Sequence, residues 1–417
     1  MKGFSVRARL PLLGAAALLV AGCGGSGGSA SAGPVASAPT PAPTVSPPAP
    51  PAPAPAPAPS PSPSPSTTAT SFAAAMSPGW NLGNSLEAIN ATGAPFTVSQ
   101  ETHWGNPAVN RQLLNAVAAA GFKSVRIPVA WRQYADGSDR IGAAWLNRVQ
   151  QVVDDARAAG LTVMINVHWD GGWLQPTNAA RDEATARLRS YWTQIATRFR
   201  DYDDRLVFAG TNEIMVTDVY SAPTTENCTV QRGFNQAFVE AVRATGGNNA
   251  NRFLVVQGYN TNIDFTVACN ATLPVDSASG RLMMEVHYYD PYDFALNEKS
   301  TLWQWGSGAT NPANTPNWGG EAYTDAQFDK MKTTFVDKGV PVILGEYGAI
   351  LRTEYDPAGT YRTAWNRYVT RSARQRGLVP MYWDNGYTTN HAFGLFNRST
   401  GAEAYPALID AIVDAGK

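Results

Sequence analysis

Short apolar segments alternate with longer amphipathic ones along most of this chain, and this alternation restricts the fold more than any other feature. An apolar run of about four to six residues is typical of a strand buried on both faces, and the longer segments have helical periodicity. The predicted strands are 79–82, 124–127, 162–167, 206–210, 253–257, 282–286, 340–344 and 379–382. The predicted helices are 110–120, 145–159, 184–199, 231–245, 324–338, 361–376 and 404–415.

The repeated order of strand and helix predicts a single (β/α)8 TIM barrel over residues 72–417. Spacings of roughly 30 to 60 residues between successive strands suit this fold. Gly121 and Gly160 follow two of the predicted helices, at the position where glycine usually ends a helix. The segment 261–280, which should hold the helix between the fifth and sixth strands, has a mostly loop-like composition.

Residues 1–23 are typical of an export signal. Basic residues precede an apolar run, 10–20, that is too short to span a bilayer, and small residues follow it. Residues 20–23 read Val-Ala-Gly-Cys, which resembles a bacterial lipobox with Cys23 as the lipidated residue. Gly24 stands where an inner-membrane lipoprotein would have aspartate, so we expect an outer-membrane lipoprotein precursor or a secreted enzyme. An ordinary signal peptide cut nearby is the alternative.

Residues 24–71 are predicted to be a disordered linker, rich in Gly and Ser and then in Pro, Ala and Ser. Such a segment has almost nothing apolar to bury and cannot offset the entropy lost on ordering. The whole chain has a net charge of −1 and no basic stripe, so we do not expect nucleic acid as a partner. We expect a monomer that meets the membrane only through a lipid on Cys23.

Two of the predicted strands lead directly into a glutamate. The run 207–213 ends in Glu213, and Glu346 follows the apolar residues of 340–344. A carboxylate there is costly unless the strand end opens into a solvated site. The carboxyl ends of barrel strands are where ligands bind, so the two residues predict the acid and the nucleophile of a retaining glycosidase. Two glutamates in structural salt bridges are the alternative.

Polar and aromatic residues stand at most of the other strand ends and support the catalytic interpretation. They include Trp80, Asn81, Arg126, His168, Trp169, Asn212, His287, Tyr289 and Trp383. Aromatic faces suit the apolar faces of pyranose rings. For Trp383, just past the eighth strand, we favour stacking on a sugar, whereas core packing is an equal alternative for the other loop tryptophans.

These motifs resemble glycoside hydrolase family 5, the (β/α)8 family of cellulases and related endo-glycanases. The resemblance covers residues 76–415. It is carried most specifically by residues 79–84, Gly-Trp-Asn-Leu-Gly-Asn, and 101–107, Glu-Thr-His-Trp-Gly-Asn-Pro. It implies an extracellular endo-β-1,4-glucanase that bacteria export as a lipoprotein precursor.

The family pattern implies Glu213 as the acid/base after strand four and Glu346 as the nucleophile after strand seven. It also implies that six further residues contact the substrate: Arg126, His168, Asn212, His287, Tyr289 and Trp383. Many members have a second histidine directly after the strand-three histidine, where this chain has Trp169. The resemblance therefore implies no particular sugar contact at residue 169.

The chemistry of glycoside cleavage gives these residues separate tasks. Burial and repulsion from a second carboxylate should raise the pKa of Glu213 and keep it protonated. Glu346 must be ionised, and we expect the Arg126 charge and a hydrogen bond from Tyr289 to favour that state. The amide of Asn212 suits the sugar 2-hydroxyl, a contact that strengthens in the transition state.

The chain has four histidines: His103, His168, His287 and His391. They show neither His-x-His nor His-x-x-x-His spacing, so we expect no catalytic metal. We also expect no cofactor, and we interpret His168 and His287 as hydrogen-bonding groups. The two cysteines of the predicted barrel, Cys228 and Cys269, fall in predicted loops after strands four and five. In an exported protein they are a candidate disulfide, and two isolated buried thiols are the alternative.

The expected activity is endo-acting hydrolysis of internal β-1,4-glucosidic bonds in cellulose-type polysaccharides. A xyloglucanase, β-mannanase or mixed-linkage glucanase of the same mechanism is the alternative, because the fold does not fix the substrate. A non-catalytic glycan-binding lipoprotein would have lost a catalytic carboxylate, whereas both are present. A metal-dependent barrel hydrolase is disfavoured by the histidine spacing.

Overall fold

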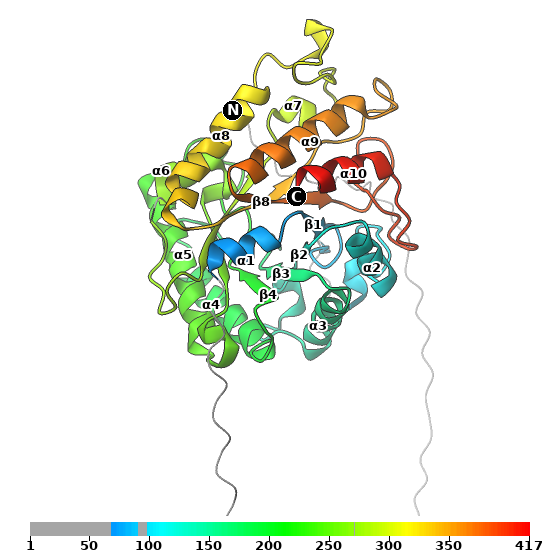
Figure 1. The fold of residues 1–417 in the computed structure, drawn as a ribbon. Helices are drawn as coiled ribbons and strands as arrows, with labels where there is room; N and C mark the ends of the chain where they lie inside the picture. Colours follow the sequence, from blue (N-terminus) through cyan, green and yellow to red (C-terminus); the bar gives the residue numbers. More distant parts are fainter. Residues whose placement is uncertain (1–67, 91–97, 271) are drawn as a thin grey trace, which may run out of the picture. The chain divides into compact units, whose positions relative to one another are not determined.

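The computed structural model describes residues 68–90, 98–270 and 272–417. The predicted signal peptide with Cys23, and the predicted linker up to residue 67, lie outside these residues. In the described part, eight parallel strands close into a barrel in sequence order, which confirms the predicted fold (Figure 1). The strands are β1 Gly79–Leu82, β2 Ser124–Ile127, β3 Thr162–Asn166, β4 Leu206–Ala209, β5 Leu254–Gln257, β6 Leu282–Tyr288, β7 Val342–Tyr347 and β8 Leu378–Asp384.

The last three strands extend beyond their predicted ends, to Tyr288, Tyr347 and Asp384. The apolar pattern stops at the last hydrophobic residue, whereas backbone pairing continues through the polar residues that follow. His287 and Glu346 therefore lie within strands rather than in the loops after them. Strand pairing fixes the direction of both side chains.

Helices follow the strands around the outside of the barrel (Figure 1). The helices are α1 Ala69–Ala75, α2 Arg111–Ala119, α3 Ala143–Ala158, α4 Arg181–Arg198, α5 Thr225–Ala244, α6 Ile263–Asn270, α7 Tyr292–Ala295, α8 Glu321–Thr334, α9 Thr360–Gln375 and α10 Pro406–Ala415. Short 3-10 turns are η1 Val98–Thr102, η2 Arg132–Tyr134, η3 Gly247–Ala250, η4 Tyr259–Thr261, η5 Pro312–Asn314 and η6 Val336–Lys338. Gly121 and Gly160 have φ values of 111° and 91°, so they end α2 and α3 as predicted.

A helix, α6, occupies part of the segment whose composition is loop-like. Its buried positions are Ile263, Thr266 and Cys269, spaced three residues apart. A buried face that carries threonine and cysteine gives little hydrophobic signal in the sequence, which is why the helix is hard to recognise.

The amino end of the barrel is covered by α1. Thr68 caps this helix by accepting a hydrogen bond from the Ser71 backbone N–H. Phe72 stacks on Phe253, which directly precedes β5, with ring centroids 4.2 Å apart. The helix shares an apolar cluster with the barrel interior, so the described fold begins before the predicted domain start at residue 72.

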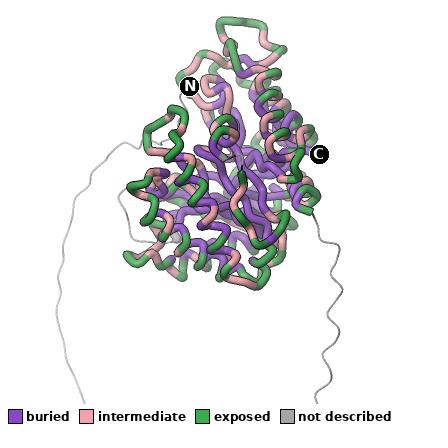
Figure 2. The backbone as a smooth tube through the Cα atoms, turned by 90° about the vertical axis from the view of Figure 1, so that its left-hand side faces the viewer, coloured by how far each residue is buried: buried purple, intermediate pink, exposed green. Residues whose placement is uncertain are grey.

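A second apolar cluster fills the layer between the strands and the outer helices, where Trp145, Trp192 and Trp365 are fully buried. Figure 2 shows a mostly buried centre, with exposed and intermediate residues on the outer turns. Among the described residues, none of the helices combines the length and apolar character needed to cross a membrane.

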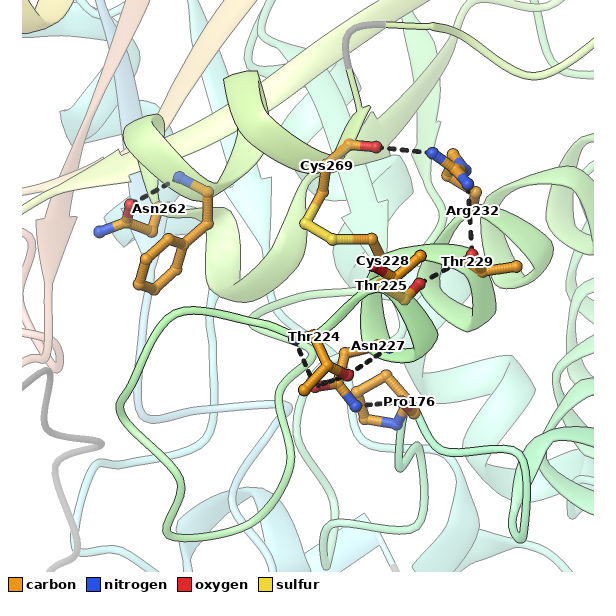
Figure 3. Close-up of a disulfide and its surroundings, with 10 residues drawn as sticks. Pro176, Thr224, Thr225, Asn227, Cys228, Thr229, Arg232, Asn262 and Cys269 are labelled. Carbon is orange, nitrogen blue, oxygen red and sulfur yellow. Dashed lines mark hydrogen bonds between the residues drawn. A yellow bond between two sulfur atoms is a disulfide. The ribbon is translucent and has the colours of Figure 1, made fainter.

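A disulfide joins Cys228 to Cys269, with Cα atoms 5.0 Å apart (Figure 3). The predicted loop positions are wrong: Cys228 lies in the first turn of α5 and Cys269 near the end of α6. Helix α5 begins six residues earlier than predicted because Thr224 and Asn227 form a capping box. Arg232 donates to the carbonyl of Cys269 at 2.9 Å and adds a second link between the two helices.

Candidate active site

The carboxyl end of the barrel brings the predicted site residues together. Arg126, His287 and Glu346 come from β2, β6 and β7, and Glu213 follows β4. A bulge in β7 directs Glu346. Val286 pairs with Leu344 but His287 pairs with Glu346, so Gly345 is the extra residue.

Gly345 is required at the bulge because Glu285 fills the space beside it. A Cβ atom on residue 345 would overlap the Glu285 carboxylate. The carbonyl of Gly345 also accepts a hydrogen bond from Asn81 Nδ2 at 2.8 Å. The bulge therefore has defined partners on β1 and β6.

Glu346 is buried among cationic and hydroxyl groups. Its Oε1 accepts from Arg126 Nη1 at 2.8 Å, and its Oε2 accepts from the Tyr289 hydroxyl at 3.1 Å. His287 Nδ1 lies 3.6 Å from Oε2. Burial raises the pKa of Glu346, and Glu213 adds to this effect, while His287 and Arg126 oppose it. The two expected contacts, from Arg126 and from Tyr289, are present, but burial outweighs the Arg126 charge, so the pKa of Glu346 is raised rather than lowered.

Glu213 is the more open carboxylate, with 32% of its side chain exposed against 7% for Glu346. Its Oε1 lies 2.8 Å from Nδ1 of His287. The burial that the sequence led us to expect at Glu213 is therefore found at Glu346 instead. The loop after β4 leaves Glu213 at the solvent side of the site, while Glu346 sits inside the barrel.

Arg126 connects the two sides of the site from a fully buried position. Its Nη2 donates to Asn212 Oδ1 at 2.6 Å and its Nη1 to Asn81 Oδ1 at 3.0 Å, besides the bond to Glu346. The carbonyl oxygen of Asn212 already accepts a hydrogen bond from Arg126. The Nδ2 group of the same amide is therefore the one that can donate to a ligand.

His287 bridges three carboxylates. Besides Glu213 and Glu346, its Nε2 lies 3.3 Å from Oε1 of Glu285. Burial alone would lower the pKa of His287, but Glu346, Glu213 and Glu285 outweigh it and raise the pKa to about 9. At neutral pH this imidazole is therefore charged.

His168, two residues after β3, and Trp383 of β8 face each other, with nearly parallel rings whose centroids are 6.2 Å apart. Burial, Arg126 and His287 hold the pKa of His168 well below its usual value, so this ring is neutral. Trp383 lies against Gly83 and is half-buried. Trp169, at the position of the departure from the family pattern, is 46% exposed.

The motif at residues 101–107 connects two loops at the carboxyl end of the barrel. Asn106 Nδ2 donates to the carbonyls of Asn84 and Asn385, both at 2.9 Å, and so ties the loop after β1 to the loop after β8. Glu101 forms an ion pair with Arg148 of α3 at 3.1 Å. The motif acts on loop geometry rather than on the two central carboxylates.

Sequence reasoning missed Glu285 and Gln257 as members of the charged network. Glu285 is fully buried, with its Oε1 2.9 Å from Arg126 Nε and its Oε2 accepting from Gln257 Nε2 at 2.6 Å. The signal was present, because Glu285 lies two residues before His287 and so faces the same side of its strand.

One group among the described residues has the composition of a possible metal site. An oxygen of Glu213, an oxygen of Glu346 and a ring nitrogen of His287 lie within 4.8 Å of one another. Arg126 and Tyr289 already bind Glu346, and a charged His287 has no lone pair to offer a metal. The group therefore fits a hydrogen-bonded acid–base cluster better than a metal centre.

A closed parallel barrel with two convergent carboxylates at its carboxyl end is the arrangement of a glycoside hydrolase. The chain matches the family model described as cellulase (glycosyl hydrolase family 5) over residues 89–389. It belongs to glycosyl hydrolase family 5, and it is an endo-acting glycoside hydrolase as the sequence predicts.

Named relatives cover most of the chain. Endoglucanase A of Paenibacillus barcinonensis is 42% identical over 358 residues, spanning 82% of this chain and 88% of the relative. A xyloglucan-specific endo-beta-1,4-glucanase of Bacteroides ovatus is 43% identical over 352 residues, spanning 82% of this chain and 69% of the relative.

Solved structures agree with this family. A Bacteroides ovatus GH5 xyloglucanase in complex with a XXXG heptasaccharide has a TM-score of 0.78 at 41% identity, covering 84% of this chain and 76% of that one. A family 5 xyloglucanase from Paenibacillus pabuli has a TM-score of 0.78 at 42% identity, covering 83% and 100%.

Proposed function

We propose that this chain hydrolyses internal β-1,4-glucosidic bonds by double displacement, with Glu213 as the acid/base and Glu346 as the nucleophile. The observation that carries the assignment is the 4.8 Å limit on the separation of their carboxylate oxygens. Retaining enzymes place the two carboxyl groups about 5–5.5 Å apart, whereas inverting enzymes need about 6.5–9.5 Å to admit a water.

The surroundings support these separate roles. Glu346 lies against Arg126 and Tyr289, which stabilise the charged form that attacks the anomeric carbon. Glu213 is partly exposed and touches His287, so it can exchange protons with a leaving oxygen and then with water. Asn212 would donate to the sugar 2-hydroxyl, and His168 and Trp383 would contact the neighbouring sugar.

The proposed substrate is a cellulose-type β-1,4-glucan, with xyloglucan as the second candidate. Xyloglucan is favoured by the xyloglucan-specific relative and by the xyloglucanase structures, which are as similar to this chain as the endoglucanase is. Its backbone presents the same linkage, so the catalytic assignment is identical for both. The substrates differ in whether the site accepts xylosyl branches.

Two measurements test the proposed mechanism and the proposed substrate. Proton NMR of the first released product should show the β-anomer, and an α-anomer would contradict the double displacement. Reducing-end assays on carboxymethyl-cellulose, xyloglucan and galactomannan should give the highest kcat/KM on one of the two glucans. A preference for galactomannan would contradict the proposed substrate.

We also propose that the chain is exported and lipidated at Cys23, and that the barrel is a monomer. The support is the order of basic, apolar and small residues before Cys23. Labelling of cells with a palmitate analogue should mark the wild-type chain and not Cys23→Ala. Equal labelling of both would contradict lipidation at this residue, and a dimer mass by light scattering would contradict the monomer.

A further inference from the structure

Glu285 is a third carboxylate, one layer deeper in the barrel than the two catalytic glutamates. It lies on the inward face of β6, two residues before His287, and its side chain is fully buried. Arg126, Gln257 and His287 surround it at 2.9, 2.6 and 3.3 Å. Arg126 Nε forms an ion pair with the carboxylate, and the nitrogen atoms of Gln257 and His287 lie within hydrogen-bond distance of it.

The surroundings keep Glu285 ionised. Burial opposes its ionisation, but the Arg126 charge and the bonds from His287 and Gln257 outweigh burial, so its pKa lies below its usual value. An ionised carboxylate only accepts hydrogen bonds, so the facing Nε2 of His287 must carry a proton. The other ring nitrogen, Nδ1, lies 2.8 Å from Oε1 of Glu213.

We propose that Glu285 is a positioning residue of the reaction: it holds a proton on Nε2 of His287 and thereby makes Nδ1 the atom that exchanges a proton with Glu213. The inference rests on the proposed role of Glu213 as the acid/base. Glu285 itself does not touch the substrate. It acts through the orientation and tautomer of His287.

The proton balance is simple. In the free enzyme the shared proton is on Nδ1, so His287 is positive and Glu213 negative. When a sugar chain covers Glu213 and excludes water, the proton moves from Nδ1 to Oε1, and both groups become neutral. Glu213 then gives this proton to the glycosidic oxygen as the C–O bond breaks and Glu346 bonds to the anomeric carbon. In the second half, the attacking water loses a proton to Glu213 as the bond to Glu346 breaks, which restores the pair.

The groups that face His287 come from five parts of the barrel end. Glu285 of β6, Glu213 after β4 and Glu346 of β7 contact the ring, and His168 after β3 interacts with it electrostatically. Arg126 of β2 and Tyr289 after β6 bind Glu346 beside it. Three carboxylates outnumber the one guanidinium, which is why the imidazole keeps its charge. We therefore expect the alkaline limit of activity to follow the loss of a proton from His287.

Nitrogen-15 NMR of the histidine-labelled enzyme tests the tautomer directly. With only four histidines in the chain, His287 can be assigned from the signals lost in His287→Gln. We expect Nε2 to stay protonated at every pH and Nδ1 to lose its proton only near pH 9. A neutral His287 with its proton on Nδ1 would overturn the proposal, whether or not any Glu285 variant folds.

The pH dependence of kcat/KM on one soluble glucan supplies the second test. In Glu285→Gln, we expect the alkaline limb to move to lower pH by about one pH unit or more, with a smaller change in KM. The reason is that loss of the buried negative charge lowers the pKa of His287. The matched control is Glu101→Gln, which removes a buried carboxylate paired with a single arginine away from His287. Its alkaline limb should match wild type.

Equal shifts of the alkaline limb in both variants would show that loss of any buried carboxylate has the same effect, and this would overturn the proposal. An unshifted alkaline limb in Glu285→Gln would also overturn it. Rescue of Glu346→Ala by azide is independent of Glu285. If that rescue works while the tautomer result fails, the inference is wrong and the proposed function stands. If the rescue fails, the proposed catalytic roles are wrong.

Discussion

Nη1 of Arg126 lies 2.8 Å from Oε1 of Glu346, and this ion pair joins β2 to β7 inside the barrel. The same guanidinium holds the side chain of Asn212, the residue directly before Glu213. One buried cation therefore contacts one carboxylate of the pair and the immediate neighbour of the other. The relative positions of the two glutamates depend on it.

Glu213→Gln should lower kcat/KM on a polysaccharide by on the order of 10²–10⁴, because an amide cannot protonate the leaving oxygen. Aryl glycosides with good leaving groups need little protonation and should lose far less activity in the first chemical step. Pre-steady-state release of the phenol measures that step. Equal losses on both substrate types would show that Glu213 is not the acid.

Glu346→Ala should be nearly inactive but regain turnover of an activated aryl β-glycoside in the presence of azide. The small anion would occupy the space of the lost carboxylate and give an α-glycosyl azide. NMR of the product identifies its anomeric configuration. A β-configured azide product, or rescue of Glu213→Gln by azide to this same α product, would reverse or refute the assignment.

Gly345→Ala should displace Glu346, because the added methyl group overlaps the carboxylate of Glu285. Overpacking in a buried site costs about 1–3 kcal/mol, and kcat/KM should fall along with the free energy of unfolding. Gly233→Ala is the control, since its Cβ meets open space within α5. That variant should keep full activity and unfold at the same or slightly higher denaturant concentration. Wild-type activity in Gly345→Ala would contradict the role of the bulge.

The free energy of unfolding should fall as the pH rises through the titration of His287. The folded-state pKa is about 9 against 6.5 for an unperturbed histidine, so the proton stabilises the fold fully below pH 6.5. This contribution is lost as the pH rises from about 6.5 to about 9. Urea titrations at several pH values measure it. His287→Gln should flatten the dependence over this range, and an unchanged slope would contradict the raised pKa.

Reduction of the disulfide between Cys228 and Cys269 should lower the free energy of unfolding. The bond closes a separation of 41 residues, for which the chain-entropy model gives about 4 kcal/mol. Urea unfolding with and without reductant measures the difference, and Cys228→Ser/Cys269→Ser should match the reduced protein in both conditions. A reductant effect that persists in the double variant would contradict this source of stability.

The strand–helix alternation was sufficient to predict the barrel, because each short apolar run must be buried on both faces and each helix must cover the sheet. The helix predictions were wrong where polar residues take the place of the hydrophobic residues that mark a helix in the sequence. Helix α6 buries Thr266 and Cys269, and α5 begins under a polar capping box rather than at its first apolar residue. Polar residues that cap a helix or lie on its buried face can be identified only from their contacts in the folded structure.

The sequence also pointed to both glutamates and to Arg126, because a charged residue at the end of a buried strand needs a site to accommodate it. It did not show that Glu346 would be buried and Glu213 partly exposed, which follows from a bulge at Gly345 and a loop after β4.

By itself, the sequence determined the fold class, the order of the strands and the residue types available at their ends, because periodicity and burial are local properties of the chain. Only the tertiary structure decided the contacts among them. Arg126 contacts both Glu285 and Glu346 because the barrel closes between β1 and β8 and brings distant strands within a few ångströms. The charge state of a buried group depends on such neighbours, so the protonation of His287 is a property of the closed barrel.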